Sequence, residues 1–249
     1  DGIKQLANEM KDLGKVLIVA PGVQRSGESK SLTLKRPLRP TKVHRFDFPA
    51  YSLDGTPADS VIMGRYLARK EYGKTPDLVV SGINSGDNTS VHALLTSGTV
   101  AASFESSLIG IPSIAFSMEV PTSELFSGGS NSDYTSSAKR SKEIAKLVLS
   151  KPLPKEVRFL NVNFPASTNE NTPVEIASLS PEKYTNEIIE DKDPRNADIY
   201  WIWGGNVKEL DEGTDAYVVY RKKSISITPI TLGFGRWSVS VLKDWYSSS

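Results

Sequence analysis

The sequence predicts an α/β fold: a parallel-core sheet in an α/β/α sandwich, followed by a carboxyl-terminal antiparallel hairpin arm and a terminal helix. Residues 77–118 read as strand, glycine-rich loop, helix and strand, a crossover for which a right-handed parallel arrangement is the strong default. After Pro165, strand-like pieces are separated by charged or Gly/Pro turns without strand–helix alternation, which favours antiparallel hairpins. We therefore expect a Rossmann-like core over residues 1–165 and an extension over residues 166–249.

The composition excludes several classes of partner and site. The 249 residues suffice for one large domain, or for one domain with an added arm. With 30 basic and 29 acidic residues, charge gives no reason to expect a nucleic-acid polymer or a membrane as partner. The absence of cysteine and the presence of only two histidines exclude disulfides, thiol catalysis and histidine-rich metal sites. Any metal should be a hard cation held by oxygen, with Mg²⁺, Mn²⁺ or Ca²⁺ as candidates.

Nothing in the sequence indicates a membrane or secretory protein. The apolar runs are too short to span a bilayer, and no signal-peptide pattern opens the chain. We therefore expect a cytoplasmic protein.

Local signals place the first elements. Apolar residues recur at helical spacing from Ile3 to Leu13, and Gly14 ends this amphipathic helix. Residues 15–20 form an apolar run that reads as a buried strand, and residues 42–47 alternate like an edge strand. The next helix has unusually complete signals, namely Thr56 at the N-cap, Pro57 at N1, Asp59 at N3 and a break at Gly73.

The segment from residue 77 to residue 118 carries the candidate site. Its first strand, residues 78–80, ends where the side chains become small and polar. The following helix begins with Ser97 as N-cap, and residues 113–118 resume as a strand. In parallel sheets ligands bind beyond the carboxyl ends of the strands, which is where the loop of residues 81–97 lies.

The start of that helix is a candidate phosphate site. The N–H groups of Ser97, Gly98 and Thr99 would bind a phosphate, which would also gain from the helix dipole. The spacing is equally consistent with a plain N-cap after a long loop, because a Gly/Ser-rich loop before a helix is a weak signal.

Apolar periodicity also predicts the helices and strands that follow Met118. Residues 119–132 are expected as a loop, residues 133–150 as a helix and residues 158–164 as the next strand. In the extension we expect strands at residues 174–178, 198–203, 216–219 and 224–228. A short final helix carries Trp237, Val241 and Trp245 on one face, and such exposed aromatics more often form a partner surface than a cofactor site.

Several short motifs resemble the SurE family of metal-dependent nucleotide phosphatases. The resemblance is carried by Ser81–Asn84, Gly86–Asn88 and Ser97–Ala102, and by Arg25-Ser26-Gly27. In the extension, Asp193-Pro194-Arg195 with Tyr200–Trp203, Gly213–Asp215 and Ser224–Ile230 also match. The chain departs from the family pattern at Asn196, where glycine is usual.

The resemblance implies a set of site residues. It assigns Asp1, Ser26 and Asn84 as ligands of one Mg²⁺ or Mn²⁺ ion per subunit, with Asp1 and Asn84 as the catalytic residues. Asp1 would orient or deprotonate the attacking water. Phosphate oxygens would be held by Ser97, Gly98 and Thr99, and Gly82 and Asn88 would shape the same wall.

The role of Asp1 depends on how the start of the chain is aligned. Family members begin with an apolar strand ending in Asn-Asp-Asp-Gly, then Pro-Gly-Ile, whereas this chain opens at Asp1-Gly2-Ile3. Asp1 is therefore either the second acid of the Asp pair, or incidental, with Gly2-Ile3 belonging to the later motif.

The expected activity is hydrolysis of nucleoside 5′- and 3′-monophosphates to nucleoside and phosphate. The alternative is a non-catalytic, oligomeric nucleotide sensor, if the first acid of the pair is truly lacking. A nucleotide-sugar transferase would need a second Rossmann-like half, for which the chain has no room. The resemblance also implies a homodimer or homotetramer formed through the carboxyl-terminal extension, commonly exchanged between subunits.

Overall fold

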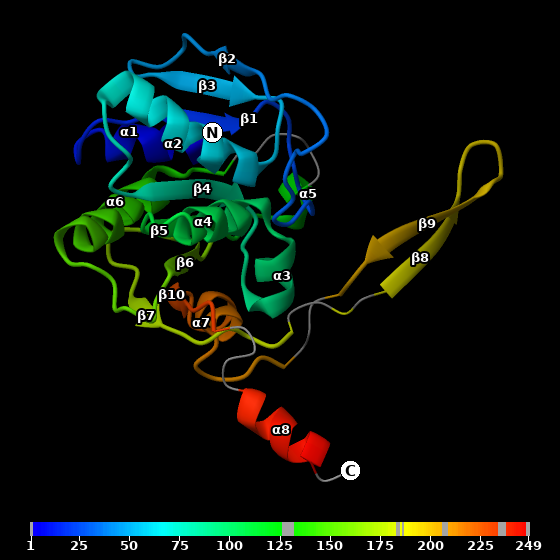
Figure 1. The fold of residues 1–249 in the computed structure, drawn as a ribbon. Coiled ribbons are helices and arrows are strands. Elements are labelled where there is room, and N and C mark those ends of the chain that lie inside the picture. The colour runs from blue at the N-terminus through cyan, green and yellow to red at the C-terminus, as the bar shows by residue number, and fades with distance from the viewer. Residues whose placement is uncertain are drawn as a thin grey trace.

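The structure is a computed structural model that describes residues 2–125, 132–182, 185, 187–205, 209–233 and 238–247. Its elements, in chain order, are α1 (Gly2–Met10), β1 (Ile18–Pro21), β2 (Pro40–Lys42), β3 (Ala50–Leu53), α2 (Pro57–Tyr72), β4 (Val79–Ser85), α3 (Ser90–Thr96), α4 (Gly98–Leu108), β5 (Ser113–Met118), α5 (Thr122–Leu125), α6 (Thr135–Ser150), β6 (Phe159–Phe164), β7 (Val174–Ile176), β8 (Glu187–Lys192), β9 (Asp198–Trp203), α7 (Asp215–Tyr220), β10 (Ile225–Ile230) and α8 (Val239–Ser247) (Figure 1).

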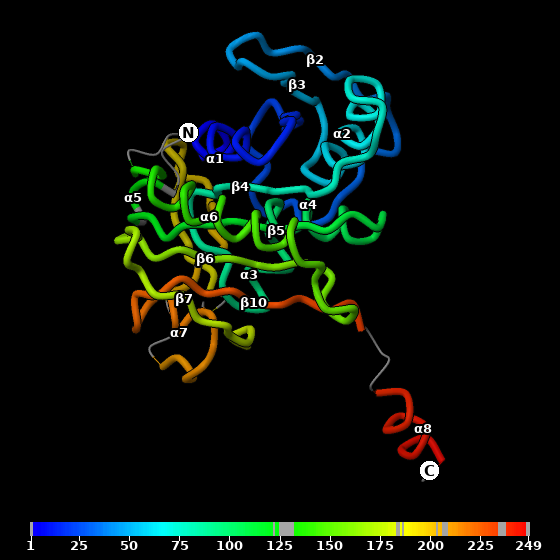
Figure 2. Tube along the Cα trace, turned by 90° about the vertical axis from the view of Figure 1, so that its left-hand side faces the viewer, coloured from blue at the N-terminus to red at the C-terminus, as the bar shows by residue number. Residues whose placement is uncertain are grey.

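The central sheet has five strands in the order β4-β5-β6-β10-β7. Its first three strands are parallel to one another, β10 runs antiparallel to β6, and β7 runs parallel to β10. Figure 2 shows β4, β5, β6 and β10 one below another. A smaller sheet in the order β1-β3-β2 pairs β1 parallel to β3 and β2 antiparallel to β3. The predicted α/β fold with a parallel core is thus confirmed.

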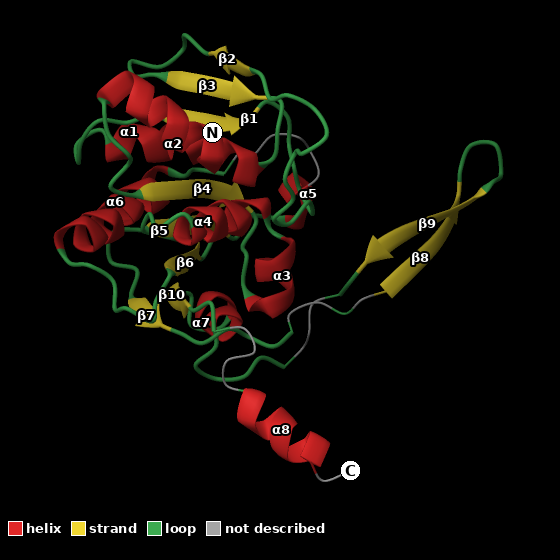
Figure 3. Ribbon diagram, viewed as in Figure 1, coloured by secondary structure: helices red, strands yellow, loops and turns green. Residues whose placement is uncertain are grey.

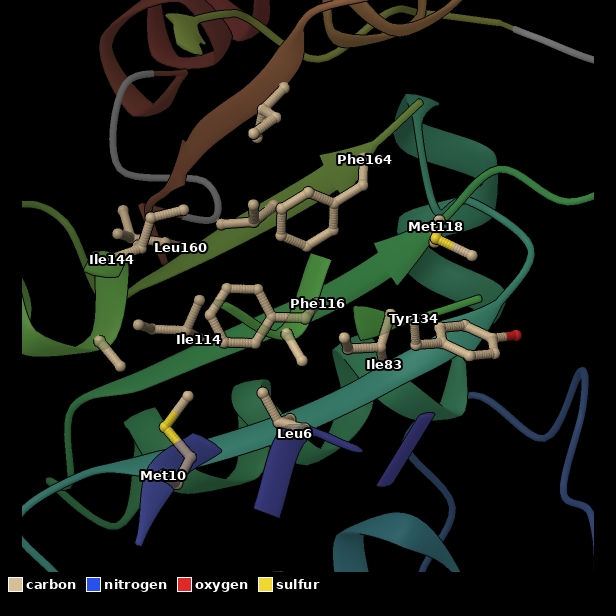
Figure 4. Packing of buried hydrophobic residues seen from close by; sticks show 14 of the residues in the cluster. Leu6, Met10, Ile83, Ile114, Phe116, Met118, Tyr134, Ile144, Leu160 and Phe164 are labelled. Carbon is tan, nitrogen blue, oxygen red and sulfur yellow. The ribbon is translucent and has the colours of Figure 1, made fainter. Parts of the chain in front are cut away.

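Alternation along the strands builds a core on each face of the central sheet. On one face Ile114, Phe116 and Met118 of β5 pack with α1 and α6, and Figure 4 shows Leu6 and Met10 of α1 in this cluster. On the other face Ala115 of β5 packs with Val100 of α4. Successive strand side chains point to opposite faces, so β5, which is fully buried, has large apolar side chains on one face and only small ones, Ser113, Ala115 and Ser117, on the other.

The predicted caps are confirmed. The Thr56 side chain accepts from the N–H of Asp59, the Asp59 carboxylate accepts from the N–H of Thr56, and Gly73 closes α2 in the left-handed conformation. Ser97 caps α4 by accepting from the N–H of Val100.

Four expected elements are corrected. Residues 81–97 are not one loop, because β4 continues to Ser85 and α3 follows. The edge strand expected over residues 42–47 ends at Lys42, and the chain returns as β3. Residues 216–219 form part of helix α7 rather than a strand, because Thr214 caps a helix by accepting from the N–H of Tyr217. The polar segment after Met118 also contains the short helix α5.

The extension is divided between core and arm. β7 and β10 belong to the central sheet, although both lie beyond residue 165. The hairpin of β8 and β9 projects from the layered body, and α8 stands apart from it (Figure 3). α8 has no buried residue. Trp237 of the expected aromatic face lies outside the described residues, whereas Val241 and Trp245 are exposed on α8.

Candidate active site

The carboxyl ends of β1, β3 and β4 point to the same side of the molecule, where α3 also lies (Figure 1). α4 packs against β4 and against α2 at this edge. The start of α4 is closely packed, because a Cβ atom added at Gly98 would lie 2.9 Å from Pro57 Cγ and 3.1 Å from the carbonyl oxygen of Arg25. Gly98 therefore allows the loop after β1 and the first turn of α2 to meet α4.

The first turn of α4 leaves two backbone donors open. The N–H of Val100 donates to the Ser97 hydroxyl at 3.2 Å. The N–H of Ser97, which was expected to bind the phosphate, instead donates to the carbonyl oxygen of Ala93 in α3, because Ser97 also ends that helix. The N–H groups of Gly98 and Thr99 precede the first intrahelical hydrogen bond and have no acceptor within the helix. Together with the positive end of the helix dipole they suit a phosphate group.

Asn84 near the end of β4 presents an amide oxygen. Its Nδ2 donates to the carbonyl oxygen of Gly86 at 2.7 Å and, more weakly, to that of Ser85 at 3.3 Å. Within the part of the chain that the structure describes, Oδ1 accepts no hydrogen bond. The side chain is thus oriented by its nitrogen, and its oxygen stays available to a ligand.

Gly82 acts through the backbone. Its φ is +114°, and an added Cβ atom would lie 2.1 Å from the carbonyl oxygen of Phe116 in β5. Strand β4 can reach its neighbour here only without a side chain. The structure therefore explains Gly82 by the approach of two strands, and its predicted place in the phosphate wall stays a prediction.

Asn88 is buried, and three of its polar atoms form hydrogen bonds. Its N–H donates to Asn163 Oδ1 at 2.7 Å, its carbonyl oxygen accepts from Asn161 Nδ2 at 2.9 Å, and its Nδ2 donates to Ser117 Oγ at 2.7 Å. Ser117 is also the register partner of Asn84 across β4 and β5. Ser117 thus lies beside both Asn84 and Asn88.

Sequence reasoning missed Ser117, Asn161 and Asn163. A signal was present, because the two asparagines alternate with apolar residues in the buried strand β6 and so share one face. Such a pattern indicates a polar layer on that face of the sheet.

Ser26 lies on the other side of the site, in the loop after β1. Its Oγ accepts from Gln24 Nε2 at 2.8 Å, and the loop is tied to the junction of α3 and α4 by hydrogen bonds from Ser29 to the carbonyl oxygens of Thr96 and Leu95. An ion pair of 2.6 Å between Lys30 and Glu105 adds to this. The structure brings the Ser26 loop to Gly98, but among the described residues no hydrogen bond joins Ser26 to Asn84.

Asp1 lies outside the described residues. Its neighbour Gly2 begins α1 against β4, where an added Cβ atom would lie 2.0 Å from the carbonyl oxygen of Ile83, the residue before Asn84. The start of α1 is therefore next to the proposed ligand on β4.

The side-chain oxygen atoms at this site are of the type that binds a hard cation. Asn84 offers an oriented amide oxygen without a partner, and Ser26 offers a hydroxyl. Over the described residues no three His, Asp or Glu side chains gather closely enough to hold a metal ion. The carboxylate ligand expected from Asp1 lies outside the described residues and stays a prediction.

A buried acid lies behind the site. Asp215 is fully buried, and burial raises its pKa to about 6, while the N–H groups of Ser180, Ser90 and Ala216 lower it and the charge of Asp87 raises it. In the sequence, Asp215 appears only as the last residue of Gly213–Asp215, one of the short motifs that resemble the SurE family. Its contact with Ser90 spans 125 positions, so no local signal could have found it.

Comparisons with known proteins agree with this architecture. Residues 1–186 match the family described as Survival protein SurE. The 5'-nucleotidase SurE of Archaeoglobus fulgidus is 39% identical over 246 residues, covering 98% of this chain and 92% of that protein. The protein of the same name from Methanosarcina barkeri is 39% identical over 239 residues, covering 93% of this chain and 87% of the relative.

A solved structure is similar over almost the whole chain. The crystal structure of the SurE protein from Aquifex aeolicus superposes with a TM-score of 0.79 at 34% identity, covering 97% of this chain and 94% of that one. Across the described residues no helix is long and apolar enough to cross a membrane. The family match, the two relatives and the shared fold lead to one conclusion: this chain belongs to the SurE family.

Proposed function

We propose that this chain is a 5'-nucleotidase that hydrolyses nucleoside monophosphates at the carboxyl edge of its parallel strands. The observation that carries the proposal is the open first turn of α4 in the crossover that follows Asn84. The names of the A. fulgidus and M. barkeri relatives support the reaction class. Activity on 3′-monophosphates is part of the same proposal. The N–H groups at a helix N-terminus bind the phosphate itself and do not contact the sugar carbon that bears it.

The proposed roles follow from the donors and acceptors of each residue. The N–H groups of Gly98 and Thr99 and the hydroxyl hydrogen of Ser97 would bind phosphate oxygens. Asn84, Ser26 and Asp1 would hold one Mg²⁺ or Mn²⁺ ion through oxygen atoms. When bound, such an ion supplies a water of lowered pKa and screens the charge of the phosphate. Asp1 would accept the proton of the attacking water.

Phosphate release tests the proposal directly. We expect the protein to release phosphate from adenosine 5′-monophosphate with Mn²⁺ or Mg²⁺, to lose this activity in excess EDTA and to regain it when the metal is restored. A malachite-green assay over a panel of 5′- and 3′-monophosphates would measure it. Phosphate release that persists unchanged in EDTA would contradict the metal centre, and no release from any nucleotide would contradict the enzyme.

We further propose that the chain forms a homodimer or homotetramer through the hairpin and α8. Both elements expose large apolar side chains, including Ile202 of β9 at 84% and Trp245 of α8 at 69% exposure. Exposed apolar surface of this kind is typical of a partner interface. Among the side chains that the structure describes, the exposed large apolar ones on the hairpin and α8 are Ile188, Ile189, Tyr200, Trp201, Ile202, Val239, Val241, Leu242, Trp245 and Tyr246.

Replacing Trp201 and Ile202 together with serine should shift the protein toward monomer. Light scattering coupled to size exclusion would measure the mass at micromolar concentration, where the wild type should be a dimer or tetramer. Tyr66→Ser is the matched control, because Tyr66 is 63% exposed but lies on α2 of the core. A monomeric wild type, or a double variant that keeps the wild-type mass, would refute this interface.

A further inference from the structure

The short helix α7 holds both ends of the loop that carries Asn88. At the first turn of the helix, Asp215 Oδ2 accepts from the N–H of Ser90 at 3.0 Å. At its last residue, the Tyr220 hydroxyl donates to Asp87 Oδ2 at 2.5 Å. The four-residue loop from Asp87 to Ser90 is thus bound at each end by a side chain more than a hundred positions away in the sequence.

Each carboxylate has its second oxygen engaged as well. Asp215 Oδ1 accepts from the N–H groups of Ser180 at 2.9 Å and Ala216 at 2.8 Å. Asp87 Oδ1 accepts from the N–H and the hydroxyl of Thr89. A buried carboxylate such as Asp215 is costly unless it accepts several hydrogen bonds, and its bonds to Ser90, Ser180 and Ala216 hold this end of the loop in place.

The backbone at Ser90 needs such a restraint. Ser90 is fully buried and has a φ of +80°, a conformation that L side chains rarely adopt. The hydrogen bond from its N–H to Asp215 holds it there. Without the carboxylate, the segment between Asp87 and Ser90 would relax toward a common conformation and Asn88 would move with it.

The restrained loop leaves one polar atom of Asn88 unused. Its backbone is held by Asn161 and Asn163 and its Nδ2 by Ser117, whereas its Oδ1 accepts no hydrogen bond from any described residue. An amide oxygen can only accept a hydrogen bond. It therefore suits a hydroxyl or amino donor of a nucleoside, and not a phosphate dianion, which has no hydrogen to donate.

We propose that Asp215 and Tyr220 are positioning residues that aim the amide oxygen of Asn88 at a hydrogen-bond donor of the nucleoside. This inference rests on the proposed nucleotidase function and deepens it. It assigns recognition of the nucleoside to the loop after β4, apart from the phosphate at the start of α4. α7, which follows the arm in the sequence, thereby contributes to substrate preference through the loop to which it is hydrogen-bonded.

Two substrates separate nucleoside recognition from phosphate binding. Adenosine 5′-monophosphate carries a nucleoside, whereas p-nitrophenyl phosphate carries none. For Asn88→Ala and for Tyr220→Phe we expect KM for adenosine 5′-monophosphate to rise roughly fivefold more than KM for p-nitrophenyl phosphate, the loss of one hydrogen bond to the nucleoside. For Asp215→Asn, which replaces one acceptor oxygen with a donor, we expect a rise of roughly tenfold with the same selectivity.

Tyr217→Phe is the matched control. It is the same substitution on the same helix, but the Tyr217 hydroxyl donates to Glu212 at 3.1 Å and does not touch the loop. Its kinetics should equal those of the wild type. Tyr220→Phe removes a single hydroxyl, so it keeps the test valid if Asp215→Asn does not fold.

The outcomes are distinct. A rise in KM that is several-fold larger for the nucleotide than for p-nitrophenyl phosphate in Asn88→Ala and Tyr220→Phe supports the inference. Equal losses on both substrates, or unchanged KM for the nucleotide in either variant, overturn it. A wild-type protein that releases phosphate from p-nitrophenyl phosphate but from no nucleotide refutes the proposed function itself.

Discussion

Asn84→Ala should lower the rate of phosphate release by at least about 100-fold and weaken Mn²⁺ binding in parallel. Even residues behind a metal ligand typically contribute roughly 10- to 100-fold in affinity or activity, so loss of a ligand should cost at least as much. The side chain is suited to this role because its nitrogen is bound to Gly86 while its oxygen stays open. Steady-state kinetics and calorimetric titration with Mn²⁺ would measure the two effects.

Ser85→Ala is the control for this prediction. Ser85 is the next residue on β4, and its buried hydroxyl has no hydrogen-bond partner in the described chain, so its removal should leave turnover and metal affinity unchanged. Melting temperatures of both variants would show that the strand still folds. If Asn84→Ala keeps wild-type, metal-dependent turnover, Asn84 is not a ligand.

Gly82→Ala should be the most destabilising single change at the site. An L residue at a φ of +114° is strained, and the added Cβ atom would lie 2.1 Å from the Phe116 carbonyl oxygen, which β5 can relieve only by moving. Backbone strain and overpacking each cost ~1–3 kcal/mol, so the melting temperature should fall by about 10 °C. Thermal unfolding followed by circular dichroism would measure the shift.

Gly110→Ala isolates the clash from the backbone strain. Gly110 also has a positive φ, +80°, but an added Cβ atom there would meet nothing within 4 Å. Its cost should be limited to ~1–2 kcal/mol of conformational strain, a smaller shift than that of Gly82→Ala. Equal shifts in the two variants would mean that the close approach to Phe116 is unimportant.

The helix starts around the site could be predicted because their signals are local. Thr56 and Asp59 cap α2 through hydrogen bonds between residues three positions apart, and Ser97 caps α4 in the same way. Such contacts involve only residues a few positions apart, so their spacing in the sequence predicts them. The candidate phosphate site at Ser97, Gly98 and Thr99 could therefore be located from the sequence alone, although its role stays a prediction.

The errors occurred where local signals were ambiguous. The apolar run of residues 216–219 is short enough to suit a strand or a buried helix, and the cap at Thr214 together with packing against β10 selects the helix. α3 was missed because its seven residues are too short a run to show a helical period and because polar residues precede and follow it. The structure also places β10 beside β6, a pairing that no spacing in the sequence specifies.

By itself the sequence determined the α/β class, the succession of strand, helix and strand between residues 77 and 118, and the cap at the start of α4, because each depends on hydrogen bonds or apolar periodicity within a few residues. Only the tertiary structure decided that Asp215 and Tyr220 of α7 hold the loop of Asn88, and that Gly82 must approach Phe116. These contacts join residues far apart in the chain, so they exist only once the strands have paired and buried the polar layer between them.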